Sequence, residues 1–287
     1  MSVPVAQLDQ SVPLRRERPR VQVAPGTPND LGYNAAMIEQ AKLKDPLFGQ
    51  VKERLQELGV VAILFDLDDT LIFTSEIFSR YMLEYASSVA EKMGVEVDEV
   101  MNGLRAINDE EYKKMGVNPK RWAAVVEKLA KQFDHGEIEI LNNLDILMKI
   151  YSTEPRLRQG VRALLETFKE SGIKIGLVTH ANVEWTYFKL DSLGLWDYFD
   201  AVVIVDENDH KKSEDWRRGM DELKVEPIKC LVVGDSLGGD IRPGDELGAR
   251  TVWMPSPWSV YREGMVPVRT VSIDEISELF TALERLR

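Results

Sequence analysis

The hydrophobic pattern of the chain contains short runs in which almost every residue is apolar. The strongest is VVAILFD, from Val60 to Asp66, where apolar and polar positions do not alternate. Runs of this kind are typical of strands that are buried on both faces of a sheet. We therefore predict strands over Val60–Asp66, Ile173–Thr179, Ala201–Val205 and Lys229–Asp235, with a shorter fifth over Arg250–Pro255.

Helical patterns separate the later strands. In the segment VRALLETFKESG, the apolar residues Val161, Leu165 and Phe168 share one helix face, and Gly172 is suited to end the helix. Strands that alternate with helices form a parallel sheet with right-handed crossovers. The pattern therefore predicts an α/β fold with a Rossmann-like, doubly wound parallel sheet.

One long interval interrupts this alternation. Between the first strand and Ile173–Thr179, apolar residues recur only with helical spacing, as at Trp122, Val125 and Leu129. A crossover between two parallel strands needs only about a dozen residues. This interval is much longer than a crossover, and its additional residues predict a helical subdomain inserted after the first core strand.

The domain organisation follows from these patterns. Residues 34–74 and 154–287 are predicted to form the α/β core, and residues 75–153 the helical insertion. Residues 1–33 are rich in Pro and Arg and show no hydrophobic period. That composition is typical of a disordered extension, because it offers little apolar surface to bury.

The charge of the chain narrows the classes of partner. Its net charge is −12, with 44% hydrophobic and 29% charged residues over 287 positions. This is an ordinary globular composition. A strongly acidic surface argues against binding to nucleic acid or to an anionic membrane, since both require a positive footprint. An anionic small molecule stays possible where a lysine or a metal ion reverses the local field.

The single cysteine, Cys230, cannot form a disulfide within the chain, and its apolar surroundings CLVVGD predict a buried structural thiol. No apolar run approaches the roughly 20 residues that a membrane span requires. We therefore expect a cytoplasmic protein that does not bind membranes.

Polar residues follow the predicted strands. Asp66 and Asp68 follow the first strand, Thr179 the second and Asp235 the fourth, with Asp240 shortly after. The carboxyl ends of parallel strands lie at one edge of the sheet, and ligands bind there in open α/β folds. These side chains are therefore expected to lie close together.

Each of these residues has an ordinary explanation when it is taken alone. A strand-end Asp usually caps a helix or serves a turn. The pair Lys211 and Lys212, in the loop after the third strand, would usually be solvated. The aspartates, Thr179 and a lysine are all expected at one edge of the sheet, and this convergence favours a functional site. Because carboxylates this close repel one another, a hard cation is expected to compensate them.

The strand-end motifs resemble those of a known family. DLDDT (Asp66–Thr70), Thr179 in LVTHAN, a lysine before a helix, and GDSLGGD (Gly234–Asp240) resemble, in order, the four motifs of the haloacid dehalogenase-like hydrolase superfamily. The resemblance covers about residues 60–255. The helical insertion resembles the cap of the phosphoglycolate-phosphatase-like branch.

The resemblance implies a phosphatase that acts on a small phosphorylated metabolite. Asp66 would be the nucleophile that forms an aspartyl-phosphate, and Asp68 the general acid and base. Family members that attack carbon lack an acid at the position of Asp68, so its presence favours phosphoryl transfer to water. Mg²⁺ is the implied cofactor, with Asp66, the backbone carbonyl of Asp68, Asp235 and Asp240 as its ligands and supports.

Several assignments stay open at this stage. Lys211 and Lys212 are both candidates for the motif lysine that, with Thr179, would bind the phosphate. His180, which replaces the Asn of many relatives, and Asn182 are candidate substrate-binding residues. Asp69, often Gly in relatives, is expected to serve the turn. The candidate substrate contacts of the insertion are Tyr112, Lys113, Arg121, Trp122 and His135.

Three other classes of protein share parts of this pattern. A phosphomutase would use the same aspartyl-phosphate and return the phosphate to an alcohol. A non-catalytic binding protein with the same fold would be expected to have lost part of the motif set. A response-regulator-like receiver also phosphorylates an Asp, but the Asp66–Asp68 spacing and the large insertion count against it. The substrate and the oligomeric state are not readable from the sequence.

Overall fold

A computed structural model describes residues 46–133 and 135–287. The predicted N-terminal extension, residues 1–33, and the first residues of the predicted core, 34–45, lie outside the described residues. Within this range the core is a six-stranded parallel sheet in the order β5-β4-β1-β6-β7-β8. Its strands are β1 (Ala62–Phe65), β4 (Lys174–His180), β5 (Ala201–Val205), β6 (Cys230–Gly234), β7 (Arg250–Trp253) and β8 (Val271–Ser272).

The sheet confirms the predicted α/β fold class. The first strand, β1, lies in the middle of the sheet and pairs in parallel with β4 and β6. All five predicted strands are present, within a few residues of the predicted bounds. The sixth strand, β8, was missed because a strand of two residues is too short to give a hydrophobic pattern.

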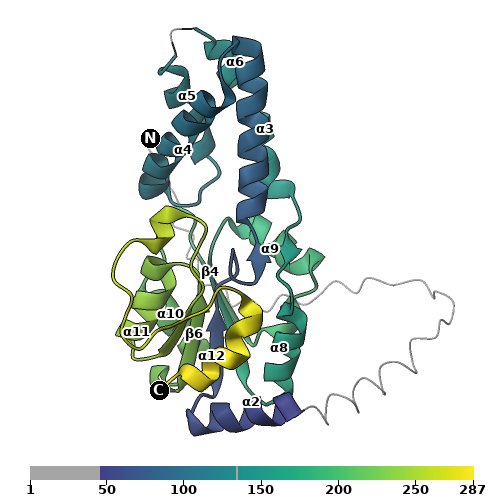
Figure 1. The fold of residues 1–287 in the computed structure, drawn as a ribbon, viewed down its shortest axis with the longest axis vertical. Helices are drawn as coiled ribbons and strands as arrows, with labels where there is room; N and C mark the ends of the chain where they lie inside the picture. Colours follow the sequence, from purple (N-terminus) through teal and green to yellow (C-terminus); the bar gives the residue numbers. More distant parts are fainter. Residues whose placement is uncertain (1–45, 134) are drawn as a thin grey trace, which may run out of the picture. The chain divides into compact units, whose positions relative to one another are not determined.

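Both faces of the sheet are covered, which explains the uninterrupted apolar runs. Successive residues of β1 alternate between two hydrophobic clusters, with Ile63 and Phe65 in one and Ala62 and Leu64 in the other. Figure 1 shows α8 and α12 on one side of the strands and α10 and α11 on the other. Cys230 is buried in the second cluster, as predicted.

The helices of the core follow the strands in alternation. They are α2 (Pro46–Glu57), α8 (Val161–Glu170), α9 (Val183–Ser192), α10 (Ser213–Leu223), α11 (Arg242–Glu246) and α12 (Leu279–Arg285). Short turns of other helix types are η2 (Trp196–Tyr198), η3 (Pro227–Lys229), η4 (Leu237–Ile241), η5 (Ser259–Arg262) and η6 (Ile276–Glu278). None of the helices in the described part of the chain is both long and apolar enough to cross a membrane.

The inserted segment is helical and has a hydrophobic cluster of its own around Tyr85 and Trp122. Its long first helix, α3, is labelled in Figure 1. Its elements are α3 (Ser75–Met93), α4 (Val97–Met115), α5 (Arg121–Ala130), α6 (Glu137–Leu141), α7 (Leu144–Met148) and η1 (Lys149–Ser152). The exact division of the chain into domains stays a prediction.

A small antiparallel pair connects the two ends of the insertion. The strands β2 (Ile72–Phe73) and β3 (Arg156–Leu157) pair with each other just before and just after the helical segment. The expectation that the interval contains no strand was therefore wrong at its two borders. Each strand has only two residues, which is too few for a periodic signal.

Candidate active site

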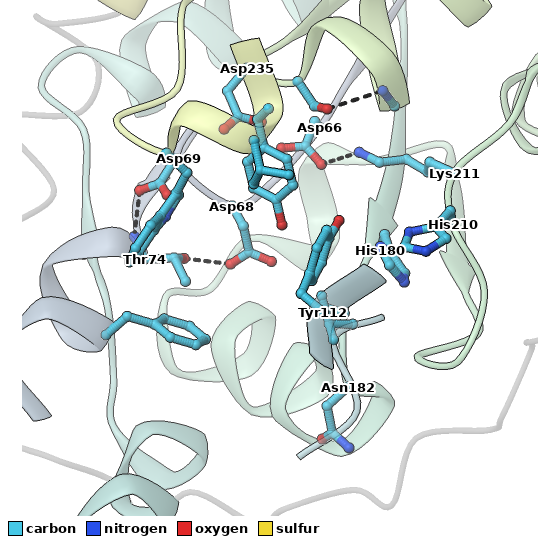
Figure 2. Close-up of a pocket in the computed structure, with 18 of the residues that line it drawn as sticks. Asp66, Asp68, Asp69, Thr74, Tyr112, His180, Asn182, His210, Lys211 and Asp235 are labelled. Carbon is cyan, nitrogen blue, oxygen red and sulfur yellow. Dashed lines mark hydrogen bonds and ion pairs between the residues drawn. The ribbon is translucent and has the colours of Figure 1, made fainter. Parts of the chain in front are cut away.

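Asp66 lies at the carboxyl end of β1 with its side chain almost fully buried. One carboxylate oxygen accepts a hydrogen bond from the hydroxyl of Thr70 at 3.0 Å. The other is paired with the ammonium group of Lys211, as Figure 2 shows. Two donors thus hold the Asp66 carboxylate in one orientation at the edge of the sheet.

The tight turn after β1 depends on Asp69. Its φ of 57° lies in the left-handed region, which Asp tolerates better than most residues. Its Oδ1 accepts hydrogen bonds from the backbone N–H groups of Thr74, at 3.1 Å, and Ser75, at 2.9 Å. These donors belong to the start of α3, which otherwise has no side-chain cap. Asp69 therefore serves the turn and the first helix of the insertion.

A second pair of carboxylates follows β6. Asp235 comes directly after the strand, and Asp240 lies in the π-helical turn η4. Oδ2 of Asp240 accepts a hydrogen bond from the backbone N–H of Ser236 at 2.9 Å. Gly234 makes this fold-back possible, because a Cβ at that position would lie 2.4 Å from Oδ2 of Asp240.

The carboxylates of Asp66, Asp235 and Asp240 form one buried cluster. Each of the three offers an oxygen, and these oxygens lie within 4.8 Å of one another. Burial raises the pKa of Asp66 to about 7; Lys211 opposes this effect, whereas Asp240 and Asp68 add to it. Burial, with Asp66 and Asp240, also raises the pKa of Asp235 well above its usual range. The cluster therefore holds more negative charge than Lys211 alone compensates.

The two candidate lysines are in different environments. Lys211 is buried and contacts both Asp66 and Asp240. Burial alone would lower the pKa of Lys211, but Asp240 and Asp66 outweigh burial and raise it. Lys212 is 56% exposed and pairs with Asp209 on the surface. Only Lys211 reaches the carboxylate cluster.

The carboxylate of Asp68 is outside that cluster and has hydrogen-bond partners of its own. Its Oδ1 accepts hydrogen bonds from the hydroxyl of Thr74 and from the ammonium group of Lys189 at 2.7 Å, and Lys189 also contacts Oδ2 at 2.8 Å. The side chain of Lys189 is fully buried and lies over the ring of Trp185. Lys189 joins α9 to the loop after β1, and its place in the site was not predicted from the sequence.

Thr179 and His180 are the last two residues of β4, and Asn182 follows the strand. Thr179 is fully buried, and its hydroxyl has no hydrogen-bond partner among the described residues. Burial lowers the pKa of His180 to about 4, with smaller contributions from Lys211, His210 and Arg121, so its ring is neutral near pH 7. Asn182 caps α9 by accepting a hydrogen bond from the backbone N–H of Trp185 at 2.9 Å.

Several of these side chains line a cavity of about 380 Å³, whereas Thr179, Asp240 and Lys189 are not among its lining residues. Asp66, Asp68, Asp235 and Lys211 lie on its walls, together with His180 and Asn182 (Figure 2). The volume falls within the range of roughly 300–1,000 Å³ that is typical of small-molecule sites.

The helical insertion supplies further walls of this cavity. Tyr112 and Arg121 line it, whereas Trp122 is buried in the insertion's own cluster and Lys113 and His135 are exposed. Sequence patterns did not mark Phe78, Tyr151, Trp185, Trp258 and Tyr261 as cavity residues, because an aromatic residue that lines a cavity has the same pattern as one that packs in a core.

The end of α4 contacts the core directly. The backbone N–H of Val117 donates to the carbonyl of Glu207 at 2.9 Å, and the side chains of Asn118 and Asn208 are hydrogen-bonded at 2.6 Å. Gly116 has a φ of 57°, and a Cβ there would lie 2.4 Å from the carbonyl oxygen of Glu207. Glycine therefore permits the close approach that brings the insertion over the carboxylates.

This architecture defines a Rossmann-like α/β protein with an acidic site at the carboxyl edge of its sheet. The family model of the haloacid dehalogenase-like hydrolases matches residues 60–248. The match spans more than half of the chain, so the protein belongs to this family, and the predicted resemblance is confirmed.

Named relatives agree with that placement. The glyceraldehyde 3-phosphate phosphatase of Pyrococcus furiosus is 25% identical over 79% of this chain and 94% of its own length. Pyrophosphatase PpaX of Bacillus mycoides is 27% identical over 80% of this chain and 99% of its own length. A haloacid dehalogenase-like hydrolase of Xanthomonas campestris shares the fold, with a TM-score of 0.63 and 17% identity over 79% of this chain and 91% of that one.

Proposed function

We propose that this protein is a Mg²⁺-dependent phosphatase that hydrolyses a small phosphorylated metabolite through an aspartyl-phosphate. The observation that carries the proposal is the placement of Asp66, which is oriented by Lys211 and Thr70 beside the carboxylates of Asp235 and Asp240. The names of relatives such as glyceraldehyde 3-phosphate phosphatase support the substrate class.

Two in-line displacements would complete the reaction. A carboxylate oxygen of Asp66 forms a bond to phosphorus while the bond to the leaving oxygen breaks, and Asp68 donates a proton to that oxygen. Asp68 then removes a proton from water, which attacks the phosphorus and releases inorganic phosphate together with free Asp66. Asp68 is hydrogen-bonded to Thr74 and Lys189, which are not partners of Asp66. This separate environment supports a role different from that of Asp66.

Thr179 and Lys211 would bind the phosphoryl group during both steps. The hydroxyl of Thr179 has no hydrogen-bond partner among the described residues and would donate a hydrogen bond to a phosphate oxygen. The ammonium group of Lys211 would offset negative charge on the same group. We assign the motif lysine to Lys211, because Lys212 points to the surface.

The carboxylate cluster fits a Mg²⁺ ion. Three buried oxygens within 4.8 Å of one another are the hard ligands that this ion prefers. Asp66, Asp235 and the backbone carbonyl of Asp68 would hold the ion, with Asp240 in support. When bound, the ion supplies positive charge that compensates both the carboxylates and the phosphate. Residues 75–153 would act as a cap that excludes water from the cavity.

Removal of the metal is expected to stop hydrolysis. Phosphate release from para-nitrophenyl phosphate, measured in excess EDTA, should fall to less than about a hundredth of its value with Mg²⁺, since one lost electrostatic stabiliser commonly costs that much. Excess Mg²⁺ should restore the rate. Circular dichroism in EDTA serves as the control for folding. A rate that EDTA leaves unchanged in folded protein would contradict the proposal.

A further inference from the structure

Arg121 is a buried cation in the wall of the cavity. Only 3% of the surface of this residue is exposed to solvent, although arginine is normally a surface residue. Nε donates a hydrogen bond to Oδ1 of Asn108 at 3.1 Å, and one terminal nitrogen lies 3.4 Å from the hydroxyl of Tyr151. The guanidinium group also lies over the rings of Phe78 and Trp122. All of these partners are uncharged.

The positive charge of Arg121 has no counter-ion among residues 46–133 and 135–287. No carboxylate of these residues lies within 4.0 Å of its guanidinium group. This includes Asp109, the only carboxylate that the described part of the insertion contributes to the cavity lining. The other buried cations of the site differ, because Lys189 pairs with Asp68 and Lys211 with Asp66 and Asp240.

A buried charge without a partner is energetically unfavourable. Such a group is explained when a ligand supplies the missing charge. Arg121 and the candidate phosphate-binding residue Lys211 line the same cavity, so one ligand can contact both. Aromatic side chains also line this cavity and favour an apolar surface between the two ends of that ligand: Phe78, Tyr112, Tyr151, Trp185 and Trp258.

We propose that the substrate is a phosphomonoester with a second anionic group, a carboxylate or another phosphate, that pairs with Arg121. The phosphate to be hydrolysed lies at Asp66 and Lys211, and the body of the substrate lies against the aromatic walls. This inference rests on the proposed phosphatase function and specifies its substrate class.

Matched aryl phosphates test whether the substrate has a second anionic group. The ortho, meta and para isomers of carboxyphenyl phosphate are each compared with the uncharged carboxamide analogue of the same shape. The wild-type protein should show a higher kcat/KM for at least one carboxylate, by roughly tenfold to a hundredfold, as for a charged hydrogen bond in a buried site.

The preference should depend on Arg121 alone. Arg121→Gln should reduce the ratio of the two kcat/KM values to about one, whereas Arg121→Lys should retain part of it. Lys113→Gln is the matched control, because it removes a positive charge from the exposed side of the same insertion and should keep the full preference. A loss of folding would lower both rates together and leave the ratio intact.

Binding separates this inference from the proposed function. Calorimetry with Asp66→Asn protein measures affinity without turnover and should show the same preference for the carboxylate, lost in Asp66→Asn/Arg121→Gln. If neither compound is hydrolysed by the wild-type protein, the phosphatase proposal fails, while the affinities still decide the role of Arg121. Equal affinities and equal rates for every isomer pair would contradict the inference that the substrate has a second anionic group. The phosphatase proposal would still stand.

Discussion

Asp66→Asn is expected to lower kcat for an aryl phosphate by more than about a thousandfold, as the loss of a nucleophile does in other covalent enzymes. The amide keeps the size of the carboxylate and can still accept the hydrogen bond of Thr70. It cannot form the acyl phosphate through an anionic oxygen, and it weakens the carboxylate cluster. Steady-state hydrolysis in Mg²⁺ measures the effect.

Asp69→Asn provides the control for Asp66→Asn. The Asn side chain accepts the same hydrogen bonds from Thr74 and Ser75 and tolerates the left-handed backbone at this position. Its kcat should stay within about tenfold of the wild type, because Asp69 is placed as a turn residue. If the Asp66→Asn protein kept more than about a tenth of wild-type activity, the result would contradict the role of Asp66 as the nucleophile.

Lys211→Gln should lose both activity and stability. Lys211 contacts two carboxylates and is buried, so its removal leaves Asp66 and Asp240 without their shared cation. Breaking a buried ion pair in this way costs about 3–5 kcal/mol. Urea unfolding in EDTA should show the loss, and Mg²⁺ should recover part of it by supplying positive charge to the same carboxylates.

Lys212→Gln is the neighbouring control. Its ammonium group is exposed and pairs only with the exposed Asp209, so urea unfolding and kcat should both match the wild type. If the Lys212 variant lost activity and the Lys211 variant kept it, the assignment of the motif lysine would be reversed.

The fold class was predictable because its signals are local in the sequence. Each apolar run is long enough to mark a buried strand, and the parallel topology then brings the residues after those runs to one edge. Asp66, Asp235 and Asp240 were therefore expected together, and the structure brings their carboxylates within 4.8 Å. The strands β2, β3 and β8 have only two residues each and gave no such signal.

The remaining features of the site depend on tertiary contacts. Lys189 meets Asp68 across 121 positions of sequence, and nothing in the helical pattern of α9 marks it as buried. The choice between Lys211 and Lys212 depended on which side chain the loop turns inward. The isolation of Arg121 from any described carboxylate is likewise visible only once its neighbours are in place.

Capture of the covalent intermediate tests the central claim most directly. In Asp68→Asn protein, an aryl phosphate with a good leaving group can still phosphorylate Asp66, but activation of the attacking water is impaired. After acid quenching with phosphate-labelled substrate and Mg²⁺, the label should be found on the peptide that contains Asp66 and should be absent from Asp66→Asn/Asp68→Asn protein. Label on another residue, or hydrolysis with no label on the protein at any time, would contradict the aspartyl-phosphate mechanism.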